Sequence, residues 1–166
     1  MVSAMTQPLP FFPASLPDET LASRVSRFHI LRGNSTDQLT FKELFGCSQM
    51  AIGLVVPANL DVLASRLPGL PLENIGHLVK TNTLFPLFRP FLGRADRSTP
   101  FLDDGTLGVE LSRIPRHVVG TVNDARLCLA CLHEDQAVGP CAYWHRAHQI
   151  PGVVIPPFLE HAKSRG

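Results

Sequence analysis

The chain has 166 residues, 45% of them hydrophobic, which suffices for one domain with its own core or for a helical domain that carries a small metal-stapled appendage; we expect the second arrangement. A net charge of +1 and a charged fraction of 17% exclude the polybasic character that binds nucleic acids irrespective of sequence. The four cysteines are too few for a disulfide scaffold, and two of them in a Cys-x-x-Cys pair favour a metal in a reducing compartment.

The first 17 residues form a Pro-rich segment. They contain four prolines and no Lys or Arg, which excludes a signal peptide and a membrane span. We therefore expect a cytoplasmic protein without a membrane partner. Because Phe11 and Phe12 favour burial, the segment is predicted to lie extended over a hydrophobic groove of the fold.

A first amphipathic helix is predicted from Asp18, which can cap its N-terminus, to Gly33, which ends it. Its apolar residues recur at helical spacing and are Leu21, Val25, Phe28 and Leu31. The other faces carry the densest basic cluster of the chain, which consists of Arg24, Arg27 and Arg32. Arginines on such a face are commonly only solvated, and the alternative is contact with DNA or an acidic partner. We expect the three to serve binding and not to stabilise the fold.

Three further helices are predicted before residue 81. Thr40 begins a capping box, and Gly46 closes the short helix that follows it. Apolar spacing predicts two more, over residues 58–66 and over residues 71–80, the last with a proline at its first position. Minimal strand content is expected over residues 18–92. The predicted core is formed by Leu21, Val25, Phe28, Phe41, Leu44, Leu60, Leu63, Ile75, Leu78 and Phe88.

The first two predicted helices permit a helix-turn-helix unit. The connection between Gly33 and Thr40 is, however, longer than the three or four residues usual for that motif. After these helices, Pro86 and Pro90 exclude a long helix and predict a kinked, buried crossing lined by Phe85, Phe88 and Phe91. A second small basic patch follows, with Arg113 and Arg116.

The stretch over residues 126–153 holds three of the four cysteines and the only Trp and Tyr. Cys128 and Cys131 are spaced to hold one tetrahedral zinc ion, as half of a site. A second pair of ligands is expected about 15–30 residues downstream. The candidates, none of which forms a second Cys-x-x-Cys or Cys-x-x-His, are Cys141, His145, His148 and His161.

Common enzyme motifs are absent from the sequence. No His-x-Glu tripeptide precedes the cysteine pair, as a zinc deaminase requires. There is also no Gly-rich phosphate loop, no His-Glu-x-x-His and no Gly-x-Ser-x-Gly. The leucines beside the cysteines and the downstream histidines suit a metal knuckle better than a redox dithiol. We therefore expect no enzymatic activity.

The sequence around the cysteine pair resembles the zinc-finger segment of the TnsD/TniQ family, whose members select the target sites of transposons. The resemblance lies in Cys128-Leu-Ala-Cys131, the acidic pair after it, and YWHRAHQIPGV over residues 143–153. The sequence segments over residues 19–29 and 81–92 also resemble segments of this family. The resemblance therefore extends over residues 8–154. It implies zinc as cofactor, with DNA and the transposon's ATPase regulator as partners.

The chain departs from the family at the end of the zinc element. Members continue with Cys-Pro-x-His, whereas here Pro156 and Leu159 stand at the two ligand positions and His161 lies two residues further on. The expected ligand set is therefore Cys128 and Cys131 with His161 or His148, and we expect an incomplete site that binds zinc weakly. The tail from Pro156 is expected to fray, since nothing anchors it.

These observations predict a mainly α protein with a helix-turn-helix-like domain and a small zinc-knuckle element. The segments are residues 1–17, a TniQ-like helical domain over residues 18–120, and an incomplete zinc-finger-like element over residues 121–166. The expected function is DNA binding or adaptor activity in transposon target-site selection. The expected DNA contacts are Arg24, Arg27, Arg32, Arg113 and Arg116. The alternative is a zinc-stapled interaction module, or a truncated remnant, that does not bind DNA.

Overall fold

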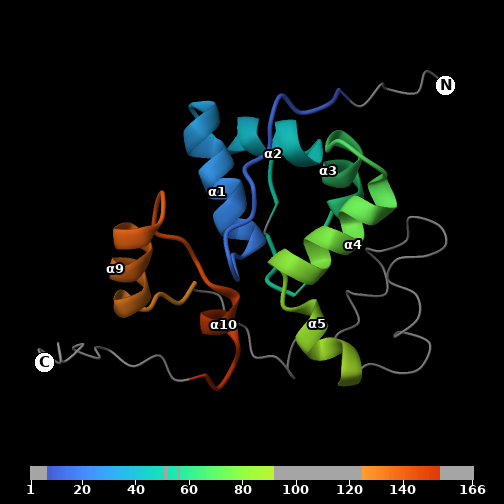
Figure 1. Cartoon of the computed structure of the whole chain (residues 1–166). Helices are drawn as coiled ribbons and strands as arrows, with labels where there is room; N and C mark the ends of the chain where they lie inside the picture. The colour runs from blue at the N-terminus through green and yellow to red at the C-terminus, as the bar shows by residue number, and fades with distance from the viewer. Residues whose placement is uncertain (1–6, 51, 56, 92–124, 154–166) are drawn as a thin grey trace, which may run out of the picture.

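The computed structural model describes residues 7–50, 52–55, 57–91 and 125–153 (Figure 1). Within these ranges the regular elements are helical and no extended strand is found, as predicted for a mainly α chain. None of the described helices is long and apolar enough to cross a membrane. The elements are α1 (Leu21–Arg32), α2 (Asp37–Phe45), α3 (Leu60–Arg66), α4 (Pro71–Asn82), α5 (Phe85–Phe88), a 3-10 turn (Arg89–Phe91), α9 (Leu129–Val138) and α10 (Arg146–Gln149).

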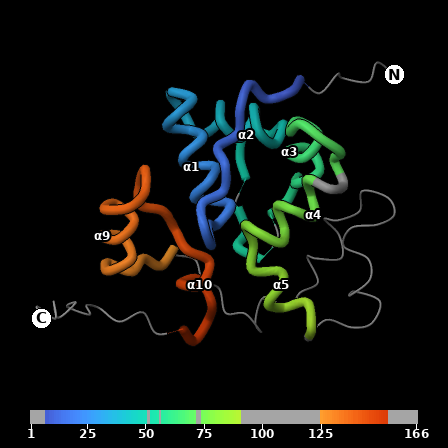
Figure 2. Tube along the Cα trace, in the orientation of Figure 1, coloured from blue at the N-terminus to red at the C-terminus, as the bar shows by residue number. Residues whose placement is uncertain are grey.

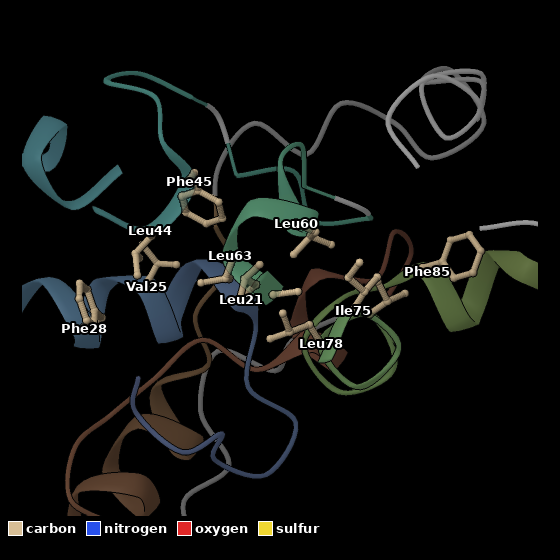
Figure 3. Packing of buried hydrophobic residues seen from close by; sticks show 12 residues of the cluster. Leu21, Val25, Phe28, Leu44, Phe45, Leu60, Leu63, Ile75, Leu78 and Phe85 are labelled. Carbon is tan, nitrogen blue, oxygen red and sulfur yellow. The ribbon is translucent and has the colours of Figure 1, made fainter. Parts of the chain in front are cut away.

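The hydrophobic core lies between α1, α2, α3 and α4. Figure 3 shows Leu21 of α1, Leu63 of α3 and Leu78 of α4 pointing toward one another. Eight of the ten residues predicted for the core are buried, while Phe41 and Phe88 are half-buried. Leu31, predicted on the apolar face of α1, is instead 63% exposed. The last turn of α1 contacts α2 through His29, whose Nδ1 lies 2.7 Å from the hydroxyl of Thr40. Leu31 is left largely exposed to solvent.

The caps of the first two helices differ from the predicted ones. Thr20, and not Asp18, caps α1 by accepting a hydrogen bond from the backbone N–H of Ser23. Thr36, and not Thr40, caps α2 in the same way, and Thr40 is buried one turn inside the helix. The connection between α1 and α2 is therefore only residues 33–36, which falls within the range of a helix-turn-helix turn.

Glycines end both helices as predicted. Gly33 and Gly46 each have φ of +72°, the left-handed conformation that a non-glycine residue adopts only with strain. Pro71 stands at the start of α4, also as predicted. The stretch with Pro86 and Pro90 is broken into α5 and the 3-10 turn, as predicted, but its burial is only partial, because Phe85 is buried and Phe88 is half-buried.

We expect opposite effects from alanine at two glycines. Gly33→Ala should destabilise the fold by about 1 kcal/mol, because φ is positive there. Gly76→Ala should stabilise it by up to about 1 kcal/mol, because Gly76 lies inside α4 with nothing within 4 Å of an added Cβ. Urea denaturation of both variants checks this, and the same sign for both would contradict it.

The N-terminal segment lies extended over the helical unit formed by α1, α2, α3 and α4, as predicted. Its described part begins at Gln7. The backbone N–H of Leu9 donates to the carbonyl of Arg66 at 3.0 Å. The ring of Phe12 packs on the core, 5.9 Å from the ring of Phe28. Phe11 also contacts Phe28 but remains 39% exposed, so only Phe12 gains the burial expected of the pair.

Candidate metal centre

The cysteine pair lies at the start of α9. Cys128 is the N-cap residue of this helix and is buried, and Cys131 follows in its first turn and is half-buried. The helix-start geometry brings the backbone N–H of Cys131 to the Cys128 sulfur, which lowers the pKa of the Cys128 thiol. Burial raises the pKa of the Cys131 thiol to about 11, and the neighbouring Cys128 adds to this shift.

His148 of α10 completes a group of three possible ligands. The ligand atoms of Cys128, Cys131 and His148 all lie within 4.8 Å of one another, and Nε2 of His148 is 3.5 Å from Sγ of Cys131. Of the downstream candidates, His148 lies close to both sulfurs, and its role as a ligand stays a prediction. The pKa of His148 is lowered by burial and by the nearby His145, so that a neutral imidazole, the form that binds metals, is favoured.

The donor set fits zinc. Two thiolates and one imidazole are ligands that zinc prefers, and three protein ligands with one further position is a known zinc arrangement. Two adjacent thiolates repel each other without a cation, which is consistent with the raised pKa of Cys131, and a dication would relieve this repulsion. Zinc would be held by Cys128, Cys131 and His148.

The fourth ligand is not among the grouped residues. Cys141 and His145 are described but do not belong to the three-residue group. Nε2 of His145 instead lies 2.9 Å from a carboxylate oxygen of Asp135, and the ring of His145 stacks on Tyr143 at 4.2 Å. His161 and the tail from Pro156 lie outside the described residues, so the predicted role of His161 and the predicted fraying stay predictions.

Gln149 connects the two sides of the metal centre and was missed by the sequence analysis. Its side chain is fully buried and accepts a hydrogen bond from the backbone N–H of Arg126. The same side chain donates to the carbonyls of Arg126 and His145. Gln149 therefore fixes the segment before Cys128 against α10. A glutamine beside a histidine carries no signal in the sequence that distinguishes it from a surface residue.

The element that carries the three candidate ligands, residues 125–153, packs against the start of α1, as Figures 1 and 2 show. The backbone N–H of Thr20 donates to the carbonyl of Trp144 at 2.9 Å, and the N–H of Trp144 reaches the hydroxyl of Ser23. Glu19 and His145 form an isolated bridge beside these contacts. The centre is therefore built onto the helical unit and is not a free appendage.

The three arginines of the basic cluster on α1, predicted to serve binding, differ in their exposure to solvent. Arg24 is only 8% exposed, donates from Nε to the Pro13 carbonyl at 2.6 Å and from a terminal nitrogen to Oδ1 of Asn82, and lies over the ring of Phe12. Burial lowers the pKa of Arg24 to about 10. These contacts join the N-terminal segment to α4 and favour a structural role for Arg24 over the predicted role in binding alone.

The other predicted arginines differ in their surroundings. Arg27 forms an ion pair with the buried carboxylate of Glu19 at 2.8 Å and donates to the carbonyl of Ala14, so it too contacts the N-terminal segment. Arg32 is paired with Glu43 at the surface, and its side chain is 45% exposed. Arg113 and Arg116 lie outside the described residues.

A comparison with known proteins identifies relatives for most of the chain. The sequence profile of the TniQ family matches residues 10–155, a range that includes the helical unit and all three grouped ligands. The transposon Tn7 transposition protein TnsD of Escherichia coli is 26% identical over 151 residues. This match covers 86% of the present chain but only 29% of the length of that relative. No solved structure is significantly similar.

Proposed function

Because the chain belongs to the TniQ family, we propose that it is a DNA-binding or adaptor protein in the selection of transposon target sites. The observation that carries the proposal is the family match, which spans the helical unit and the metal centre together. In this proposal the protein is not an enzyme. It recognises DNA, docks the transposon's ATPase regulator, or does both, and zinc on Cys128, Cys131 and His148 braces α9 and α10.

The proposed DNA-binding surface lies at the end of α1 and on α2. The connection over residues 33–36 is short enough for a helix-turn-helix unit, with α2 as the helix that follows the turn. A groove of about 1120 Å³ opens beside α2, and both Arg32 and Lys42 line it. Lys42 is exposed, and Arg32 is held only by a surface ion pair, so both can reach phosphates.

The role proposed for the other arginines follows from their burial. Arg24 is removed from the proposed DNA surface, because its guanidinium is buried and donates to groups inside the protein. Arg27 lies beside the N-terminal segment, and its side chain is mostly covered. Arg113 and Arg116, outside the described residues, remain proposed contacts of the DNA backbone.

Binding of duplex DNA should weaken with salt, and Lys42→Gln should reduce the slope of the log-log salt plot by about 1. Lys80→Gln, which removes an exposed lysine from α4, is the matched control and should leave the slope unchanged. Fluorescence anisotropy with labelled duplexes over a range of salt concentrations measures both slopes. Equal slopes for the two variants would contradict the assignment of the surface to α2.

A protein-interaction module without DNA binding is the second candidate function. It is favoured by the net charge of +1 and by two adjacent apolar side chains at the end of α1, Ile30 and Leu31, which are 74% and 63% exposed. Apolar side chains exposed together are common at protein interfaces. The same anisotropy titration separates the two functions, because this module would bind no duplex even at low salt.

A further inference from the structure

We infer that Asp18 is a positioning residue for the metal centre: its carboxylate and carbonyl hold the first turn of α10 and so place His148 opposite the two cysteines. This inference rests on the proposed metal site. Asp18 lies just before α1 and is far in sequence from the three candidate ligands, so the inference is that a contact between distant segments positions one of them.

Asp18 makes three contacts to the start of α10. Its carbonyl accepts from the backbone N–H of Arg146 at 2.7 Å. One carboxylate oxygen accepts from Nε of Arg146 at 3.0 Å, and the other accepts from the backbone N–H of Ala147 at 2.9 Å. The backbone of Asp18 has φ of +56°, a conformation that Asp tolerates better than most residues and that here directs both groups toward α10.

Arg146 extends the contact to a second helix of the core. Its terminal nitrogen donates to the carbonyls of Lys80 at 2.8 Å and Thr83 at 3.2 Å, at the C-terminal end of α4. Helix ends leave such carbonyls unpaired, and a cation there is favoured by the helix dipole. The Asp18–Arg146 pair thus connects α10 to the residues just before α1 and to the C-terminal end of α4.

His148 depends on this placement because its ring lacks the usual support. A metal-binding histidine commonly donates its other ring N–H to a carboxylate or carbonyl, which fixes the orientation of the ring. Nδ1 of His148 is buried and has no hydrogen-bond partner among the described residues. The ring of His148 contacts the ring of His145, with the centroids 5.0 Å apart, but no hydrogen bond at Nδ1 from the described part of the chain fixes its orientation. The position of Nε2 near Cys131 therefore depends on the backbone of α10, whose start Asp18 and Arg146 hold and whose end Gln149 holds.

The test is zinc affinity of the full chain, measured by chelator competition, with Asp18→Asn as the main variant. Asn keeps the tolerance for positive φ but loses one acceptor and the charge, and the dissociation constant for zinc should rise about tenfold or more. Asp61→Asn, an exposed aspartate on α3, is the matched control and should bind zinc as the parent does. A second variant, Asp18→Gly, adopts positive φ without strain and should show the same loss.

Cobalt absorption spectra separate positioning from a general loss of stability. At saturating Co²⁺, Asp18→Asn should show the spectrum of His148→Ala, and the double variant should bind no more weakly than His148→Ala alone. A parent-like spectrum at saturation, additive losses in the double variant, or recovery of parent affinity in Asp18→Gly would each overturn the inference. Unchanged zinc affinity in Asp18→Asn overturns it and leaves the metal site standing, whereas a parent chain that binds no zinc overturns both.

Discussion

Replacing Arg24 by Gln is expected to lower the free energy of unfolding by about 3–5 kcal/mol, the usual effect of removing one member of a buried charged network. The guanidinium is nearly inaccessible and is bonded to the carbonyl of Pro13 and the side chain of Asn82. Its loss leaves these acceptors unpaired and removes a positive charge near the fully buried Glu19. For a chain of this length the melting temperature should fall by about 10 °C.

The matched control is Arg32→Gln on the same helix. Arg32 forms one surface ion pair with Glu43, and such pairs contribute about 1 kcal/mol or less. Thermal unfolding followed by circular dichroism measures both variants. Equal shifts in melting temperature, in either direction, would contradict the distinction between a buried and an exposed arginine on α1.

Replacing Cys131 by Ser is expected to abolish stoichiometric zinc binding. The parent chain should hold one zinc ion. Loss of a thiolate ligand should weaken zinc binding by more than about 10–100-fold, which is the usual effect of removing a residue that only hydrogen-bonds to a ligand. Metal analysis after dialysis measures the content per chain. Zinc at a hundredfold excess over its dissociation constant should stabilise the parent by about 2.7 kcal/mol and leave Cys131→Ser unchanged.

Two further cysteine variants complete this experiment. Cys47→Ser, outside the metal group, should keep full zinc content and serves as the control. Cys141→Ser tests whether Cys141 supplies a fourth ligand. Because Cys141 does not belong to the three-residue group, this variant should also keep its zinc. Substoichiometric zinc in the parent would contradict the proposed site and support the incomplete site that the departure from Cys-Pro-x-His predicts.

The sequence by itself determined the features that depend on neighbouring residues. Gly33 and Gly46 end their helices, and Pro71 begins another, because turn and cap conformations are set within a few residues. The spacing of Leu21, Val25 and Phe28 likewise predicts a buried helix face, since helical period alone places them together. The Cys-x-x-Cys pair indicates a metal for the same local reason.

Only the tertiary structure decided between residues with equal local chemistry. Thr36 and Thr40 can both cap a helix, and the choice depends on the contact of Thr40 with His29 across the turn. Arg24 and Arg32 differ because Asn82, 58 residues away, meets only Arg24. His148, and not Cys141 or His145, reaches the cysteines, with α10 held by Asp18 from 128 residues away. Burial and partner choice arise from segments distant in sequence, which no local pattern encodes.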